Sequence, residues 1–398
     1  MSKRNGDDVV ICSAVRTPIG KFMGVLSDVP SPLLGSAVIR AAVAQARAHV
    51  DWVDEVLMGC VLSANLGQAP ARQAMLGAGL SAATSATTVN KVCGSGLKSI
   101  MLAADGLRLG DSKVVVAGGM ESMSGAPYLV PRARAGYKVG HAVFVDHLMR
   151  DGLEDAYESG RSMGTFGEDT AVAYGFTRAE QDAYAFETVR RAQDAIAQGR
   201  FAAETVTVTV GVGAKASEVT VDEIPGKISL EKIPGLRPAF RSNGTITAAS
   251  SSANSDGAAA LVLSTRDHAI KMGMPVLARV VAHAAHARAP AEFTLAPIGA
   301  VQKVLDKAGW SVSDVDLFEI NEAFAVVVMA AMEDLKLTHD RVNVNGGACA
   351  LGHPIGASGA RVLVTLLHAL HARELHRGVA TLCIGGGEAV ALALELSS

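Results

Sequence analysis

The sequence has few aromatic residues and no excess of charge of one sign, and each absence excludes a class of protein. Phe, Trp and Tyr make up 4% of the 398 residues, so the hydrophobic fraction of 49% is built largely from aliphatic side chains. Interiors of this kind are typical of covered parallel sheets and closely packed helices. The 36 Lys and Arg residues are matched by 39 Asp and Glu residues, which leaves a net charge of -3. We therefore expect no nucleic-acid partner.

Cysteine is scarce, and long apolar runs are missing. The five cysteines are an odd number and include no C-x-x-C pair, so we expect neither a disulfide framework nor a metal site. The N-terminal M-S-K-R-N-G-D-D is not typical of a secretory signal. The uncharged stretch 342–360 contains five glycines, two asparagines and a proline, so it is not a membrane span. We expect no membrane partner and a reducing, cytoplasmic location.

Two cysteines and one histidine lie in glycine-rich turns. Cys93 lies in V-C-G-S-G, Cys383 in C-I-G-G-G and His353 in G-H-P-I-G-A-S-G. Apolar spacing predicts a strand ending near Val89 and a helix that continues to Gly110, so Cys93 should lie at a strand-to-helix turn. The N–H groups of such a turn favour a thiolate, and the adjacent glycines let a carbonyl group approach the backbone.

The other three cysteines have simpler explanations. Cys12 and Cys60 lie in apolar runs typical of strands, so core packing explains both. Cys349 shares the glycine-rich segment of His353, so it is expected to line the site without doing chemistry. The turn after Cys93 lacks the spacing of a phosphate-binding loop, and a lone G-x-G is not a dinucleotide fingerprint.

The two ends of the chain form a pseudo-repeat. Helical patterns at 34–46 and 298–308 each precede a strand, a glycine turn, a central helix and a second strand that reaches glycines. The second central helix is expected at 358–372. This order predicts an α/β fold of two similar halves with mostly parallel sheets. In it, Cys93 and His353 would occupy equivalent turns, as would Gly118 and Gly385.

An insertion of different composition separates the halves. We divide the chain into a first half (1–123 and 243–270), a loop domain (124–242) and a second half (271–398). The basic residues at the start of the insertion are expected either to be solvated, to contact another subunit or to meet phosphates. A capping box at Thr177–Glu180 begins a helix. Its predicted apolar face consists of Ala183, Phe186, Val189 and Ile196.

Several polar residues of the second half can be explained without a catalytic or metal-binding role. His368, His371 and His376 are expected on a solvated helix end, since no cysteine or acidic cluster completes a metal shell. Asn321 is expected either to cap a helix beginning at Glu322 or to belong to the site. Glu319 and Glu322 receive no role.

Eight motifs in order, from Val9 to near the C-terminus, resemble those of the thiolase family. They are S-A-V-R-T-P-I-G, A-P-A-R-Q-A, V-C-G-S-G-L-K-S, V-A-G-G-M-E-S-M-S, R-P-A-F, N-E-A-F-A, N-V-N-G-G-A-C-A-L-G-H-P-I-G-A-S-G and C-I-G-G-G-E. The resemblance is greatest to the acetyl-CoA acetyltransferases of that family. It implies a five-layered α-β-α-β-α core with a loop domain inserted in the first half.

The resemblance also implies a role for each candidate residue. Cys93 would be the nucleophile, His353 would accept its proton, and Cys383 would be the second acid/base. Asn321 would hold a water that forms one oxyanion hole with His353. The main-chain amides of Cys93 and Gly385 would form the other.

The implied substrates are acetyl-CoA, acetoacetyl-CoA or other 3-ketoacyl-CoA, and free CoA, with no tightly bound cofactor. The residues implied for the CoA slot are Leu153, Met163, Phe240, Ser252, Ala323 and Phe324. The chain has Ser162-Met163 where many relatives have His-Met, which bears on the coenzyme contact and the acyl preference. It also has Ser255-Asp256-Gly257 in place of N-D-G.

The expected reaction is reversible condensation of two acetyl-CoA, or thiolysis of 3-ketoacyl-CoA, through acyl-Cys93. The family implies a homotetramer or homodimer. One alternative is a decarboxylating 3-ketoacyl synthase, which Cys383 disfavours because that chemistry needs no second thiol. The other is a non-enzymatic homologue that binds CoA thioesters. Retention of Asn321, His353 and both cysteines disfavours it.

Overall fold

The computed structural model describes residues 8–397, so the N-terminal segment judged unlike a signal lies almost wholly outside the described residues. The first half contains β1 (Val9–Arg16), β2 (Gly20–Lys21), β3 (Glu55–Gly59), β4 (Ser85–Val89), β5 (Val114–Ser122) and β10 (Ser255–Thr265). Its helices are α1 (Ser31–Gln45), α2 (Pro70–Gly77), α3 (Ser95–Leu109) and α6 (Arg266–Lys271).

The second half repeats this plan. Its strands are β11 (Ala278–Ala287), β12 (Leu317–Ile320), β13 (Arg377–Ile384) and β14 (Glu388–Leu396). Its helices are α7 (Ala296–Ala308), α8 (Ala325–Leu335), α9 (Ala348–Leu351) and α10 (Ile355–Ala372). The insertion contributes β6 (Tyr128–Leu129), β7 (Val145–Asp146), α4 (Met163–Tyr174), α5 (Arg178–Ala197), β8 (Val208–Val210) and β9 (Ser217–Val219).

The strands form two half-sheets that meet at a narrow seam. Their order is β12-β13-β14-β11-β1-β10-β5-β3-β4, with β2 beside β10. At the seam, β1 pairs with β11 through only Val10 and Ile11. The long strand β10, which follows the insertion, lies between β1 and β5, so the chain returns to the first half before it enters the second.

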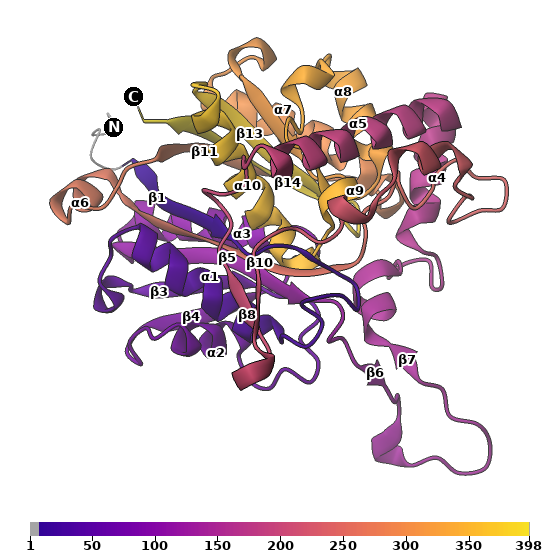
Figure 1. The fold of residues 1–398 in the computed structure, drawn as a ribbon, viewed down its shortest axis with the longest axis horizontal. Helices are drawn as coiled ribbons and strands as arrows, with labels where there is room; N and C mark the ends of the chain where they lie inside the picture. Colours follow the sequence, from indigo (N-terminus) through magenta and orange to yellow (C-terminus); the bar gives the residue numbers. More distant parts are fainter. Residues whose placement is uncertain (1–7, 398) are drawn as a thin grey trace.

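Helices cover both faces of each half-sheet and produce five layers (Figure 1). The central helices α3 and α10 lie against each other between the half-sheets, in one apolar cluster that contains Leu97, Ile100, Leu363 and Leu367. The outer helices α1 and α2 pack on the first half-sheet, and α7 and α8 pack on the second. The predicted five-layered α/β fold is therefore confirmed.

The expectation of mostly parallel sheets is wrong. Among the paired strands of residues 8–397, only β3–β4, β3–β5 and β12–β13 are parallel, whereas the strands at the centre of the sheet pair antiparallel. One cause is the hairpin between β13 and β14, where Gly386 (φ +93°) and Gly387 (φ +91°) adopt a conformation that favours glycine. The alternation of helices and strands in the sequence does not reveal such a hairpin.

Two aspartates make the internal repeat visible in atomic detail. The carboxylate of Asp54 accepts two main-chain N–H bonds at the start of β5, and that of Asp316 accepts two at the start of β13. Aligning these two aspartates matches Gly118 with Thr381, so the predicted equivalence of Gly118 and Gly385 is wrong. The physical reason is that Gly118 lies inside its strand, where a Cβ would come within 2.0 Å of a carbonyl oxygen, whereas Gly385 lies in the hairpin turn.

The four helices predicted in the two halves are present, as α1, α3, α7 and α10. Among the described residues, α10 alone is long and apolar enough to cross a membrane, and 83% of its residues are buried inside the molecule. A helix in the core of a globular fold can have the same length and apolar composition as a membrane-spanning helix. Its place between the two half-sheets explains its composition.

The capping box of α5 is confirmed. The predicted apolar face of this helix is confirmed for Val189 and Ile196, which pack in one apolar cluster, and is wrong for Ala183 and Phe186. Ala183 and Phe186 are exposed, and the buried face instead includes Gln181, Tyr184 and Thr188. These polar side chains can be buried because each one hydrogen-bonds to another part of the protein. Hydrophobic periodicity alone cannot detect a face that is held by polar contacts.

Candidate active site

Cys93 lies in the turn between β4 and α3, as predicted. Val92 has a φ of +46°, a strained value for a β-branched residue. Two side chains hold this conformation, since Asn90 Oδ1 accepts from Val92 N (2.9 Å) and Ser95 Oγ donates to Val92 O (2.6 Å). A Cβ at Gly94 would lie 2.4 Å from Ile384, so glycine is needed for the first half to approach β13.

The Cys93 thiol is protonated in the free protein. Burial of the sulfur raises the pKa of Cys93 to about 11. The main-chain N–H groups of Gly385 and of Cys93 itself oppose this by hydrogen-bonding to the sulfur. The field of the turn, expected to favour the thiolate, is therefore outweighed by burial, and the nucleophile requires a base.

His353 supplies an unprotonated ring nitrogen. Its Nδ1 lies 2.5 Å from Ser358 Oγ, and that hydroxyl donates its own proton to Pro354 O at 2.9 Å. With the hydroxyl assigned as the donor to Pro354 O, Ser358 accepts from Nδ1–H, which leaves Nε2 as the acceptor. Nε2 is buried without a protein partner among the described residues. Burial, assisted by the charge of Arg361, lowers the pKa of His353 to about 3, so the ring is a neutral base.

Asn321 lies directly after β12, and its side chain lies beside His353. Its main-chain N–H donates to Thr381 O (3.0 Å), and its Nδ2 lies 3.5 Å from His353 Nδ1. Its Oδ1 is buried and has no protein partner among the described residues. The helix-capping alternative is wrong, because α8 begins at Ala325 with Phe324 at its N-cap.

Cys383 lies near the end of β13, next to the glycine turn. It is 1% exposed and packs in an apolar cluster with Phe166, Ile246 and Phe324. Burial and the neighbouring Cys93 hold the pKa of Cys383 far above its ordinary value. Once formed, its thiolate would be an unusually strong base.

The residues predicted for the coenzyme slot surround one cavity. A cavity of about 310 Å³ is lined by Leu153, Met163, Phe240, Ser252 and Phe324, together with His353. Ala323 lies behind it, and its carbonyl accepts from both N (3.0 Å) and Oγ (3.1 Å) of Ser252. The cavity is therefore bordered by apolar side chains and by His353.

Sequence reasoning missed part of this lining. Met123, Met149, Gly164 and Asn254 also border the cavity. Ser162, noted for its departure from relatives, borders it at the N-cap of α4. Met123 directly follows β5 and Met149 begins a short π-helix (Met149–Leu153), and the sequence motifs alone do not mark either as a cavity residue.

A second missed residue is Glu121, at the end of β5. It is fully buried and accepts main-chain N–H bonds from Val61, Leu62 and Gly356. Burial raises the pKa of Glu121 to about 7, although these three N–H bonds act in the opposite direction. Because Gly356 follows the His353 turn, Glu121 ties this turn to the first half.

The other cysteines and histidines do not form a site. Cys349 is buried against Glu322 O (3.7 Å) and does not border the cavity. The prediction for His368 is wrong, because it is partly buried and hydrogen-bonds to Ala14 O at 2.9 Å. His371 and His376 are exposed as predicted. Within residues 8–397, no group of three His, Cys, Asp or Glu side chains is arranged to hold a metal.

The basic start of the insertion forms a projecting arm. Arg132, Arg134 and Lys138 are exposed on the hairpin of β6 and β7, which extends from the body of the molecule (Figure 1). Arg150 has a different location. It borders a second cavity, of about 260 Å³, together with Tyr157, Met163, Gly385 and neighbouring residues. Arg150 is thus the basic residue of the insertion that lies near the glycine turn.

Comparisons with known proteins agree on one family. The family model described as thiolase, N-terminal domain, matches residues 9–267, and that described as thiolase, C-terminal domain, matches residues 274–396. A probable acetyl-CoA acetyltransferase of Dictyostelium discoideum is 50% identical over 393 residues, which cover 98% of this chain and 95% of the relative. An acetyl-CoA acetyltransferase of Escherichia coli is 48% identical over 97% of this chain and 98% of its own length.

Solved structures give the same result. The crystal structure of a Bacillus anthracis acetyl-CoA acetyltransferase matches with a TM-score of 0.95 and 40% identity, over 98% of this chain and 99% of that one. A thiolase from Ascaris suum, in complex with coenzyme A, matches with a TM-score of 0.93 and 41% identity, over 98% of this chain and 100% of that one. The similarity extends over both halves and the insertion.

Proposed function

This chain belongs to the thiolase family, and on that premise we propose that it is an acetyl-CoA C-acetyltransferase. It condenses two acetyl-CoA to acetoacetyl-CoA and CoA, or runs the reverse thiolysis. The observation that carries the proposal is that Cys93 of the first half lies beside Gly385 and Cys383 of the second half. Cys93 also packs in one apolar cluster with Leu153, which lines the same cavity as the neutral His353. The neighbouring cavity is lined by residues that the family resemblance assigns to coenzyme A.

In the first half-reaction, the proton of Cys93 passes to His353 Nε2 as the sulfur attacks the thioester carbon. The C–S bond to CoA breaks, and CoA leaves as a thiol with the proton of Cys383. The N–H groups of Cys93 and Gly385, which already reach the sulfur, stabilise the charge on the acyl oxygen. The products are acetyl-Cys93, the Cys383 thiolate and protonated His353.

In the second half-reaction, the Cys383 thiolate takes an α-proton from a second acetyl-CoA. The resulting carbanion attacks the acyl carbon, a C–C bond forms, and the Cys93 sulfur leaves and regains its proton from His353. Protonated His353 and a water held by Asn321 stabilise the enolate oxygen. Burial supports this role for Cys383, because a thiolate with a raised pKa is a better base.

This chemistry needs no tightly bound cofactor, because the thiols and the imidazole move every proton. Longer 3-ketoacyl-CoA substrates are also proposed, since the Met and Phe side chains of the cavity are apolar. Either direction connects the enzyme with fatty-acid metabolism. A decarboxylating synthase is less well supported, because its chemistry gives the buried Cys383 no catalytic role.

We also propose a homotetramer or homodimer. The support is the exposed apolar surface of the projecting arm, where Tyr128 (66%), Val143 (67%) and Phe144 (69%) are exposed. Light scattering of the wild type and of Phe144→Ser tests this proposal. A cytoplasmic location is proposed because both catalytic thiols must stay reduced. Cell fractionation tests it.

The experiment for the proposed function combines steady-state kinetics with one substitution. Initial rates of acetoacetyl-CoA thiolysis, with CoA varied, should give the parallel double-reciprocal lines of a ping-pong mechanism. Cys383→Ser should still acetylate Cys93 but lose deuterium exchange at the α-carbon of acetyl-CoA. Intersecting lines, or exchange unchanged in Cys383→Ser, would contradict the assignment.

A further inference from the structure

Glu322 directly follows Asn321 and is completely buried. An ionised carboxylate in such a place is costly unless hydrogen bonds satisfy it. Its two oxygens accept from four residues: Tyr184 Oη (2.8 Å), Thr188 Oγ1 (2.9 and 3.0 Å), Asn343 Nδ2 (2.9 Å) and Cys349 N (3.0 Å). Such a complete set of donors indicates that the position of this carboxylate is closely fixed.

The donors come from two separate parts of the chain. Tyr184 and Thr188 lie on α5 of the insertion, whereas Asn343 and Cys349 lie on the segment that leads to His353. Thr188 Oγ1 also accepts from the N–H of Gly347 at 2.8 Å. A Cβ at Gly347 would lie 2.3 Å from Glu322 Cδ, so the segment packs directly on the carboxylate. Glu322 therefore joins the insertion helix to the histidine segment.

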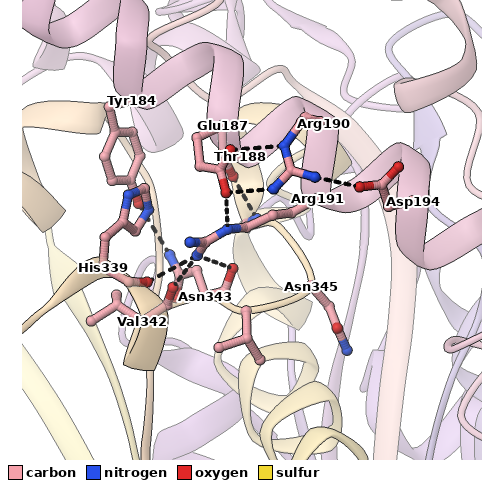
Figure 2. Close-up of polar contacts among 12 residues, drawn as sticks. Tyr184, Glu187, Thr188, Arg190, Arg191, Asp194, His339, Val342, Asn343 and Asn345 are labelled. Atoms are coloured by element: carbon pink, nitrogen blue, oxygen red, sulfur yellow. Dashed lines mark hydrogen bonds and ion pairs between the residues drawn. The ribbon is translucent and has the colours of Figure 1, made fainter.

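A second contact holds α5 against the same segment, as Figure 2 shows. Arg191 donates to the carbonyl oxygens of His339 (3.0 Å) and Val342 (2.8 Å), and Glu187 pairs with it at 2.7 Å. Tyr184 stacks on the ring of His339 with centroids 4.9 Å apart. The helix thus cannot move without moving the segment.

The residues on both sides of Asn321 make main-chain contacts within this network. Asn343 Oδ1 accepts from Ile320 N (2.8 Å), and its Nδ2 donates to Ile320 O (2.8 Å) and to Glu322. On the other side, Glu322 O accepts from Cys349 Sγ at 3.7 Å. Asn321 therefore lies between two residues that α5 and the histidine segment hold in place.

We propose that Glu322 is a positioning residue that couples helix α5 of the insertion to Asn321. The proposal rests on the proposed function. Through Glu322, the hydroxyls of Tyr184 and Thr188 orient Asn321 for the enolate step. The N–H groups of Cys93 and Gly385 lie outside the network, and His353 has its own contacts, with Ala253 O (3.0 Å) and Ser358 Oγ (2.5 Å). Disturbing it should therefore slow the second half-reaction more than the first.

The test compares the two half-reactions in variants of α5. Thr188→Val removes a donor to Glu322 and the acceptor of Gly347 N. We expect α-deuterium exchange into acetyl-CoA and condensation kcat to fall roughly ten- to a hundredfold. The rate of Cys93 acetylation and the KM for acetyl-CoA should change less than about threefold. Thr188→Ser keeps the hydroxyl and should restore exchange.

Tyr184→Phe removes a single hydroxyl and gives the same comparison if Thr188→Val does not fold. Its matched control is Tyr174→Phe on α4, whose hydroxyl bonds to Asp334 (3.1 Å) away from Glu322. The control should keep both rates. Folded variants with a lower Tm but an unchanged ratio of exchange to acetylation would overturn the proposal, as would an equal fall in both steps. Absence of Cys93 acetylation in the wild type would instead overturn the proposed function.

Discussion

Ser358 Oγ lies 2.5 Å from Nδ1 of His353, and this contact decides which ring nitrogen is free to act as a base. Because Ser358 donates its own proton to Pro354 O, it cannot donate to the ring. This assignment places the proton on Nδ1 and leaves Nε2, which has no protein partner among the described residues, as the base. A hydroxyl on the central helix thus sets the protonation pattern of the base.

Ser358→Ala removes the partner that fixes this tautomer. We expect kcat to fall about tenfold with KM little changed, because only part of the enzyme then presents an unprotonated Nε2. Steady-state kinetics measures the change. Ser99→Ala is the matched control, since Ser99 Oγ makes the same kind of helix contact, to Ser95 O at 2.9 Å, away from His353. Equal losses in both variants would contradict the role of Ser358.

The low pKa of His353 predicts a loss of stability in mild acid. Unfolding raises this pKa from about 3 to the ordinary value of 6.5, so protons bind preferentially to the unfolded chain. The stability is fully present above pH 6.5 and is lost as pH falls towards 3. Relative to pH 8, the loss from this residue should be about 2 kcal/mol at pH 5. Urea unfolding of the wild type and of His353→Gln measures it, and parallel pH curves would contradict the burial of a neutral ring.

The raised pKa of Cys93 predicts slow alkylation of the free enzyme near neutral pH. Because the thiol titrates at about 11, the rate of its reaction with iodoacetamide should rise about tenfold per pH unit between pH 7 and 10. Mass spectrometry after timed alkylation gives the rate, with Cys93→Ser to identify the site. A plateau below pH 7 would mean that Cys93 and His353 form an ion pair before substrate binds.

Gly164 should control the width of the coenzyme cavity. A Cβ at this position would lie 2.3 Å from the ring of Phe240, which must then move into the cavity or away from it. We expect Gly164→Ala to raise the KM for acetyl-CoA by about tenfold. Gly106→Ala in α3 is the control, since a Cβ there meets nothing within 4 Å. The control should leave KM unchanged, and an unchanged KM in Gly164→Ala would exclude this cavity as the coenzyme site.

Local patterns were sufficient to predict the elements that carry the chemistry. Cys93 and His353 occupy equivalent turns before the central helices, as the repeat predicted, because apolar spacing and glycine turns are local signals. Helix α10 begins at Ile355, three residues before the predicted start. The antiparallel pairing, the true equivalent of Gly118 and the polar face of α5 depend on partners far away in the chain. The domain boundaries remain a prediction.

In the candidate site, too, local motifs are predictable from the sequence, whereas contacts between distant segments are not. The motifs indicated Cys93, Cys383, His353 and Asn321, but they did not reveal Ser358, which lies within a recognised motif and acts through the ring it contacts. No role for Glu322 is evident from the motifs, because the groups that donate hydrogen bonds to it lie on α5 and on the histidine segment. Contacts of this kind become visible only when the two halves and the insertion are folded together.

The most direct test of the mechanism is the mass of the intermediate. The wild-type enzyme is incubated briefly with acetyl-CoA, quenched in acid and digested, and each peptide that contains a cysteine is weighed. We predict one acetyl group on Cys93, and its absence in Cys93→Ser. An acetyl group on another residue, or none on a protein shown to be folded, would contradict the role of Cys93 as the nucleophile.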